Sequence, residues 1–300
     1  MTKAKSIAVV GLGSMGFGMA QSALRAGHAT WGFDVAPDRV EKLIGEGGKS
    51  GSIPSVAPGL DIAAIVVLNA HQTKAVLFGD TGIVQHMTPG SCVVSCATVP
   101  PDFAREMAAK CTARGVLYLD APISGGAAKA ADGLLKIMAS GPPAAFEAAQ
   151  AALDAMAETV FDLGAEPGCG SAMKAVNQLL AGVHIAAMAE AITFGKSQGI
   201  EPGRTLDVIS KCAGTSWMFE NRAPHIVAGD YSPRSSVNIW PKDLGIVLDI
   251  AKAARFSAPI TAVALQQFVA ATGMGLGGED DAAVAKVYAR NAGLTLPGEA

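Results

Sequence analysis

A strand, a glycine-rich turn and a helix follow one another near the start of the chain, and this order constrains the fold more than any other feature. The apolar run SIAVV, residues 6–10, is typical of a parallel strand buried on both faces. It leads into a GxGxxG pattern made of Gly11, Leu12, Gly13, Ser14, Met15 and Gly16. We expect the first glycine to form a tight turn, the second to let a pyrophosphate approach the backbone, and the third to let the following helix, residues 17–26, pack on the sheet.

An acidic residue at the end of the next strand adds to this pattern. The run ATWGFD ends at Asp34, about 20 residues after the glycines, where a carboxylate can accept hydrogen bonds from the adenosine ribose and repel a 2′-phosphate. The spacing therefore predicts an NAD site that includes Asp34 and Val35, with NAD preferred to NADP. We expect Arg39 to lie on a solvated helix face. A βαβ turn without a cofactor is the alternative.

Strand and helix patterns continue to alternate up to residue 164, which predicts a doubly wound sheet. The predicted strands are 61–69, 91–98, 116–122, 133–140 and 159–164, and the predicted helices are 71–79, 103–113 and 141–157. Ligands bind at the carboxyl edge of such a sheet. Leu68, Asn69 and Thr98 end two of these strands, so we expect them near the dinucleotide.

The loop after the strand 116–122 could bind an anion. Pro122 restricts one backbone angle, while Gly125 and Gly126 free the backbone after Ser124 to present successive N–H groups. Such a segment can hold a carboxylate or a developing oxyanion. A plain turn between two elements is the alternative interpretation.

Residues 164–199 predict one long helix that begins near Ser171 and reaches roughly 40 Å. The helix is apolar nearly all round, so we expect a buried spine. Its polar exceptions share one broad face and are Lys174, Asn177, Gln178 and His184. Polar groups on a buried helix must be hydrogen-bonded or line a cleft, and we interpret this face as the wall of an active site.

The remaining chain carries apolar residues at helical spacing between glycine and proline breakers. We therefore expect an N-terminal Rossmann domain, residues 1–165, and an all-α domain, residues 166–300, joined by the long helix. Within the second domain, a helix is expected to start at Pro241 with Lys242 and Asp243 in its first turn. A lysine opposes the dipole there, which suggests that it reaches a cofactor.

The composition excludes several classes of partner and ligand. A net charge of −3 gives no electrostatic reason to expect nucleic acid or an anionic membrane, and we expect no apolar run that spans a bilayer. The chain is interpreted as cytoplasmic. Five cysteines without a CxxC pair predict neither a disulfide framework nor a metal site, and Cys92 and Cys96 are expected to be buried strand thiols.

Together these motifs resemble the β-hydroxyacid dehydrogenase family, which includes 3-hydroxyisobutyrate and tartronate semialdehyde enzymes. The resemblance rests on GLGSMGFGMA, Thr98 before its prolines, DAPISGG, GCGSAMKAVNQ and KDLG, in that order over nearly the whole chain. The segments QLLAGVHIAAMAEA, SWMFENR and LTLPG look closer to the L-threonate dehydrogenase branch.

The resemblance implies that Lys174 is the catalytic lysine. It further implies that Ser124, Gly125 and Gly126 hold the substrate carboxylate and that Thr98 and Lys242 contact the cofactor. Gln178, one turn after Lys174, is expected to orient the substrate hydroxyls, with Asn177 as the weaker candidate. Much of the family has asparagine in place of Gln178. A lysine acts as a base only when neutral, and the helix N-terminus, partial burial and oxidised nicotinamide would all disfavour its ammonium form.

The expected reaction is NAD-dependent oxidation of a small hydroxy acid, with L-threonate as the first candidate substrate. A 3-hydroxyisobutyrate or tartronate semialdehyde enzyme is the alternative within the family, and a non-catalytic NAD(H)-binding protein is the alternative outside it. The apolar, alanine-rich second domain predicts a homodimer or homotetramer.

Overall fold

The computed structural model describes residues 4–299. The chain divides into two compact units, Met1–Lys174 and Ala175–Ala300, each described here by itself. The division falls inside the long helix α8 (Cys169–Ser197), later in the chain than the expected domain boundary between residues 165 and 166.

The first unit alternates strands and helices, as the sequence predicted. Its elements in chain order are β1 (Ser6–Val10), α1 (Gly16–Arg25), β2 (Ala29–Phe33), α2 (Pro37–Gly45), α3 (Ile53–Val56), η1 (Ala57–Gly59), β3 (Ile62–Ile65), α4 (Ala70–Phe78), η2 (Ile83–Gln85), β4 (Cys92–Ser95), α5 (Pro101–Thr112), β5 (Leu117–Asp120), β6 (Ile123–Ser124), α6 (Gly126–Asp132), β7 (Leu135–Ala139), α7 (Pro143–Met156) and β8 (Ala157–Asp162).

Five of these strands form the parallel sheet of a Rossmann fold, in the order β2-β1-β3-β4-β5. The predicted doubly wound sheet is therefore present, but the later strands do not extend it. β6, β7 and β8 form a separate three-stranded sheet in which β6 and β7 are antiparallel. Pro122 lacks an N–H and cannot continue the β5 ladder. An isolated antiparallel bridge between Asp120 and Ser140 links the two sheets.

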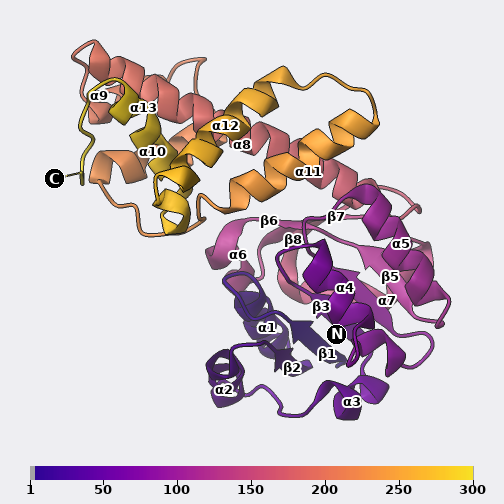
Figure 1. The fold of residues 1–300 in the computed structure, drawn as a ribbon. Helices are drawn as coiled ribbons and strands as arrows, with labels where there is room; N and C mark the ends of the chain where they lie inside the picture. The colour runs from indigo at the N-terminus through magenta and orange to yellow at the C-terminus, as the bar shows by residue number, and fades with distance from the viewer. Residues whose placement is uncertain (1–3, 300) are drawn as a thin grey trace. The chain divides into compact units, whose positions relative to one another are not determined.

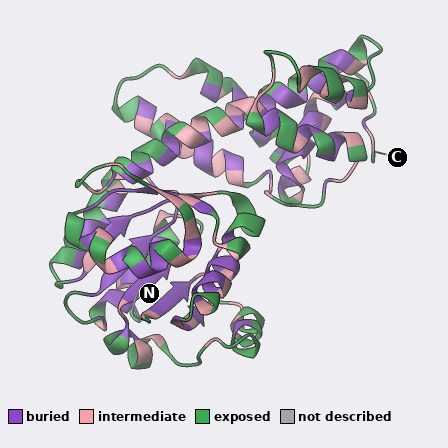
Figure 2. Ribbon diagram, turned by 180° about the vertical axis from the view of Figure 1, so that it is seen from behind, coloured by how far each residue is buried: buried purple, intermediate pink, exposed green. Residues whose placement is uncertain are grey.

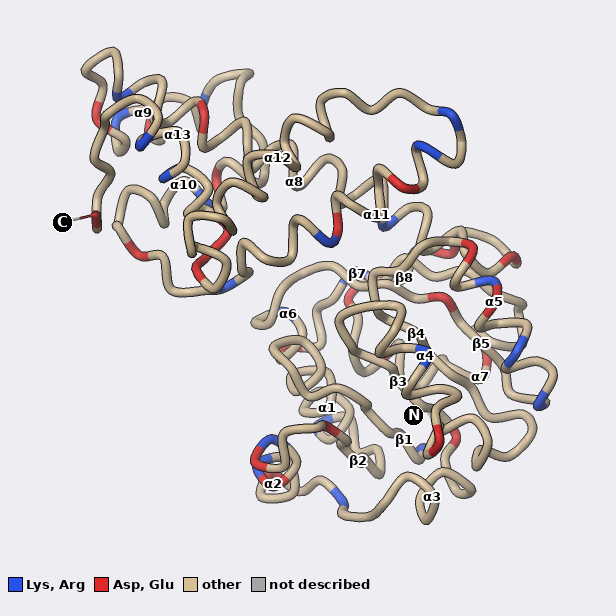
Figure 3. Tube along the Cα trace, in the orientation of Figure 1, with Lys and Arg blue, Asp and Glu red and all other residues tan. Residues whose placement is uncertain are grey.

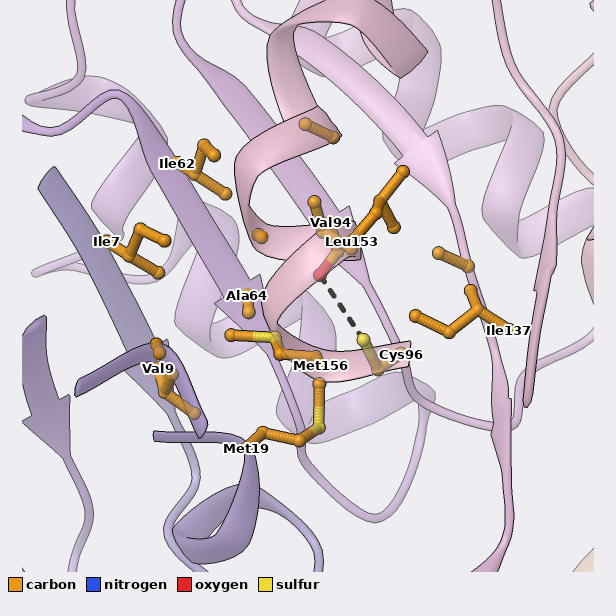
Figure 4. Packing of buried hydrophobic residues seen from close by; sticks show 14 of the residues in the cluster. Ile7, Val9, Met19, Ile62, Ala64, Val94, Cys96, Ile137, Leu153 and Met156 are labelled. Carbon is orange, nitrogen blue, oxygen red and sulfur yellow. Dashed lines mark hydrogen bonds between the residues drawn. The ribbon is translucent and has the colours of Figure 1, made fainter. Parts of the chain in front are cut away.

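Helices cover both faces of the five-stranded sheet, which is visible in the lower part of Figure 1. On one face, the side chains of Ile7, Val9 and Val94 pack with residues of α1 and α7, such as Met19 and Met156 (Figure 4). The residues between them on the same strands point to the other face, where α4, η2 and α5 pack. This two-sided burial explains why the strand sequences are apolar without alternation.

The cysteines expected in strand β4 are buried free thiols. Burial raises the pKa of Cys92, Cys96 and Cys111 to about 12, and the thiol of Cys96 lies 3.8 Å from the carbonyl oxygen of Val94 (Figure 4). Among residues 4–299, no three His, Cys, Asp or Glu side chains gather as a metal site would require.

The second unit consists of helices joined by loops, as expected. They are the remainder of α8 followed by α9 (Pro202–Ile209), α10 (Trp217–Ala228), α11 (Ile239–Ala253), α12 (Pro259–Gly273), η3 (Leu276–Gly278), η4 (Asp281–Val284) and α13 (Ala285–Asn291). Figure 2 shows buried, intermediate and exposed residues along the helices of this unit. Acidic and basic residues are interspersed along the chain and do not gather by sign (Figure 3).

The long helix α8 is less buried than its composition predicted. Met173, Val176 and Leu180 are roughly half-exposed, so the expectation of a spine buried all round is wrong. The later turns do pack in the helical core, through Ile185 and Ile192 among others. Helix α11 comes close at Gly182, where a Cβ would lie 2.8 Å from Leu244 Cδ2. Small residues on α8 therefore do admit a neighbouring helix.

Helix α8 is also long and apolar enough, by length and composition alone, to cross a membrane. The expectation that no run could do so is wrong by this criterion. A core helix meets the same two criteria, and Ile185, Met188 and Ile192 of α8 are almost fully buried against other helices. Burial in a protein core accounts for part of this hydropathy, since 44% of the most apolar stretch of α8 is buried.

Candidate active site

The glycine turn has the geometry that its spacing predicted. Gly11 has φ +96°, and a Cβ there would lie 2.3 Å from the carbonyl oxygen of Val66, so no other residue fits. A Cβ on Gly16 would lie 1.8 Å from the carbonyl oxygen of Gly11. Because glycine has no Cβ, α1 can start directly against the turn. At Gly13 nothing lies within 4 Å of that point. The backbone is thus open where a pyrophosphate would approach.

Asp34 follows β2 directly and holds the glycine turn in place. Its carboxylate accepts hydrogen bonds from the N–H groups of Leu12, at 2.6 Å, and of Ala36, at 2.9 Å. Arg39 of α2 is half-exposed, as expected, but its guanidinium also lies 3.5 Å from the same carboxylate. Sequence reasoning missed this ion pair because the contact depends on how helix α2 packs, which places Arg39 next to the end of β2.

The other predicted cofactor residues occupy varied surroundings in the first unit. Leu12 is buried under the turn, while Ser14, Val35 and Leu68 are exposed. Two have local structural roles, because Met15 is the N-cap residue of α1 and the side chain of Asn69 caps α4 by accepting from the Gln72 N–H. Thr98 is half-buried, three residues beyond β4.

The predicted anion-binding loop joins two short elements. Ser124 ends β6 and pairs with Lys136 of β7, and α6 begins at Gly126. Gly125 and Gly126 are exposed and have φ +143° and +81°, a conformation that favours glycine at both residues. The sequence predicted the turn but neither β6 nor α6.

Lys174 lies beside this loop. Its side chain is buried, and Nζ donates a hydrogen bond of 2.9 Å to the carbonyl oxygen of Ile123, the residue before Ser124. Residues 51 apart in the sequence are thereby brought together within the first unit. The predicted catalytic amine and the predicted carboxylate-binding segment are neighbours.

A buried carboxylate that the sequence did not single out holds the start of α8. Asp120 Oδ2 accepts hydrogen bonds from the N–H groups of Gly168, at 3.0 Å, and Ser171, at 2.8 Å, and Oδ1 accepts from the Ser171 hydroxyl at 2.7 Å. Burial raises the pKa of Asp120, and these donors oppose that rise. An acid directly after an apolar strand was the available signal, but nothing in the sequence names its partners.

In the second unit, Gln178 and Lys242 meet at a second buried carboxylate. Asp243 Oδ2 accepts from Gln178 Nε2 at 2.5 Å, and Oδ1 lies 2.6 Å from Lys242 Nζ. The carboxamide oxygen of Gln178 accepts from Asn177, so both ends of this side chain are held. His184 is half-buried further along α8.

Sequence reasoning missed Asp243 because it treated this residue only as a partner of the helix dipole. Helix α11 begins at Ile239, two residues before Pro241. Asp243 therefore lies beyond the first turn and does not act as a dipole partner.

Comparison with known proteins agrees with this geometry. Residues 6–164 match the NAD binding domain of 6-phosphogluconate dehydrogenase, and residues 168–288 match the family described as NAD-binding of NADP-dependent 3-hydroxyisobutyrate dehydrogenase. The chain is 48% identical to the L-threonate dehydrogenase of Cupriavidus necator, over 99% of each chain. It is 47% identical to that of Escherichia coli K12, over 97% of this chain and 96% of the relative.

A solved structure is similar over the same extent. The 3-hydroxyisobutyrate dehydrogenase of Salmonella typhimurium superposes with a TM-score of 0.89 at 47% identity, covering 94% of this chain and 99% of that one. Two matched domains, full-length relatives and a shared fold lead to one conclusion. The chain belongs to the β-hydroxyacid dehydrogenase family and is an NAD-dependent oxidoreductase that acts on a small hydroxy acid.

Proposed function

We propose that this enzyme oxidises L-threonate to 2-oxo-tetronate. The observation that carries the proposal is the hydrogen bond from Lys174 Nζ to the carbonyl oxygen of Ile123, because it brings an amine to the loop of Ser124, Gly125 and Gly126. Relatives named L-threonate dehydrogenase, 44–48% identical over nearly the whole chain, support the choice of substrate.

In this proposal Lys174 moves the proton. NAD, when bound, supplies the hydride acceptor. The neutral amine of Lys174 takes the proton of the substrate hydroxyl as the carbon loses its hydride, and the C–O bond becomes a carbonyl. In the reverse direction the ammonium returns that proton. The backbone N–H groups of Gly125 and Gly126, with the Ser124 hydroxyl, would hold the substrate carboxylate.

Gln178 is proposed to orient the hydroxyl groups of the substrate. Its carboxamide is fixed between Asn177 and Asp243, which gives it one defined orientation. A fixed amide suits a polyhydroxylated acid better than the methyl-bearing 3-hydroxyisobutyrate, because an unpaired polar group beside a methyl would be costly.

The NAD site is proposed to comprise the glycine turn and the residues that follow the neighbouring strands. Gly13, which is open, would face the pyrophosphate, and Asp34 would accept hydrogen bonds from the ribose and disfavour a 2′-phosphate. The remaining proposed contacts are Gly11, Leu12, Ser14, Met15, Gly16, Val35, Leu68, Asn69, Thr98 and Lys242.

In this proposal residues 1–165 form the NAD-binding domain and also supply the carboxylate-binding loop, while residues 166–300 form the substrate and oligomerisation domain, which carries Lys174 and Gln178. Exposed apolar side chains on the second unit, among them Phe194, Ile260 and Val263, support a homodimer or homotetramer. Light scattering on the purified enzyme would measure its mass. A cytoplasmic location fits five free thiols without a disulfide, and cell fractionation would test it.

The test is a panel of hydroxy acids with NAD and with NADP, following absorbance of the reduced nicotinamide, on wild type and Lys174→Ala. We expect L-threonate with NAD to give the highest kcat/KM, and Lys174→Ala to lose about 10²–10⁴-fold in kcat while still binding NAD. Lys196→Ala is the matched control, since it removes a lysine from the other end of α8.

Turnover of Lys174→Ala close to that of wild type would rule out the proposed base. Preference for 3-hydroxyisobutyrate, the substrate in the Salmonella relative's name, or faster reduction of tartronate semialdehyde with NADH, would favour the alternative substrates. NAD binding without turnover of any acid would indicate a non-catalytic NAD(H)-binding protein.

A further inference from the structure

The first turns of α8 are bonded to the segment 120–123 at two levels. Ser171 donates to the carboxylate of Asp120, and Lys174 donates to the carbonyl oxygen of Ile123. The two residues of each pair are 51 positions apart in the sequence. The second contact therefore lies three residues after the first on both the segment and the helix. The position of the Lys174 amine relative to the Ser124 loop therefore depends on the contact between Ser171 and Asp120, which also fixes the start of the helix.

The start of α8 is closely packed. A Cβ on Gly170 would lie 2.4 Å from the carbonyl oxygen of Met138 and 2.7 Å from that of Asp120, so α8 is pressed against the junction of the two sheets. The Gly170 N–H donates to the Ser140 hydroxyl at 2.9 Å, and Ser140 in turn bridges to the backbone of Asp120. Three amides at the helix start thus end on Asp120 and Ser140.

We propose that Asp120 is a positioning residue for the reaction: by capping the start of α8 from 51 residues away, it places the amine of Lys174 against the substrate-binding loop. This inference depends on the proposed role of Lys174. Side chains that act through another group in this way matter because small misplacements of a reacting group are costly, up to about 10²-fold in rate for 1 Å.

Asp120→Asn tests the proposal in the full-length enzyme with NAD. Asparagine keeps the volume but replaces one carboxylate oxygen by an NH2 donor, so it cannot accept from both N–H groups and from the Ser171 hydroxyl together, and it removes the negative charge at the helix start. We expect kcat to fall between about 10- and 100-fold. The KM for NAD is expected to stay unchanged, because the glycine turn is not touched.

Ser171→Ala is the milder variant, in case Asp120→Asn folds poorly. It removes one donor and leaves the carboxylate and the backbone N–H in place. Its matched control is Ser22→Ala, which removes an equally buried hydroxyl that bonds to Ala130 in α6. We expect Ser171→Ala to lower kcat severalfold more than Ser22→Ala does. Equal kcat values in the two variants would overturn the proposal.

A double-mutant cycle separates positioning from general damage. If Asp120 acts through the amine, Asp120→Asn should cost no further residual turnover in a Lys174→Ala background. A loss of the same factor in both backgrounds would overturn the proposal, as would wild-type kcat in Asp120→Asn. Full turnover of Lys174→Ala alone would instead remove the proposed function itself, whatever Asp120→Asn does.

Discussion

Each unit contains a buried aspartate whose carboxylate has lost its hydration, and the two carboxylates are stabilised by different partners. Asp120 and Asp281 are both almost fully buried, and burial raises the pKa of each. Asp120 is surrounded by neutral donors from a helix start. Asp281 lies 2.6 Å from the guanidinium nitrogen Nε of Arg222 and accepts from the Trp240 indole at 3.1 Å.

The difference shows what each carboxylate does for the protein. A cation offsets the charge of Asp281 directly, and the pair joins α10 and α11 to the segment after η3, so its removal should act on stability. At Asp120 the positive end of a helix offsets the charge, and the exact start of that helix is what the contact determines. Removal of the Asp120 carboxylate should therefore change the position of residues on α8, Lys174 among them.

The largest expected effect is on stability. Asp281→Ala removes a fully buried carboxylate and leaves the partly buried guanidinium of Arg222 without its partner, which costs about 3–5 kcal/mol. Urea denaturation followed by circular dichroism measures this loss. Turnover per folded molecule is expected to fall much less than in Asp120→Asn. Asp230→Ala is the control, since it removes an exposed carboxylate 3.0 Å from Arg234 and should leave the midpoint little changed. An equal shift in both variants would contradict the comparison.

A glycine pair tests how closely the helix start is packed. Gly170→Ala would drive a methyl group into the carbonyl oxygen of Met138, and we expect a loss of about 1–3 kcal/mol together with a lower kcat. Gly245 lies within α11 and has nothing within 4 Å of its Cβ site. Gly245→Ala should therefore raise stability by about 0.5–1 kcal/mol. Differential scanning calorimetry compares the two, and a shift of the same sign would argue against the close approach at Gly170.

The smallest expected effect is a difference in thiol reactivity. Cys92, Cys96 and Cys111 lie in the first unit, and a pKa raised to about 12 leaves almost no thiolate at pH 8. Cys169 and Cys212 are exposed and should react at once with a chromogenic disulfide reagent. The three slow thiols should react faster in Asp120→Asn and at the wild-type rate in Asp281→Ala. Faster reaction in Asp281→Ala would contradict the separation of roles.

Local patterns predicted much of this molecule correctly. The glycine turn, Asp34 after β2 and the extent of α8 all follow from chain neighbours, since a turn, a strand end or a helix depends on residues close in sequence. The same holds for the buried thiols of β4. Lys174 was identified through a family motif as well as through its place at the start of a helix.

The pairings that complete the site could not be predicted in this way. Asp120 with Ser171, Asp243 with Gln178, and Asp34 with Arg39 join residues from different elements. No periodicity encodes such partners. The exposed face of α8 and the separate sheet of β6, β7 and β8 were missed for the same reason, because burial and strand pairing depend on what packs alongside.

The sequence by itself therefore determined most of the elements and the glycine turn, and it singled out Lys174 as the proposed amine, because each depends on short-range geometry and residue chemistry. Only the tertiary structure decided where that amine lies. Its partner loop is 51 residues away, and the contact exists because a buried carboxylate must find donors once it has left water.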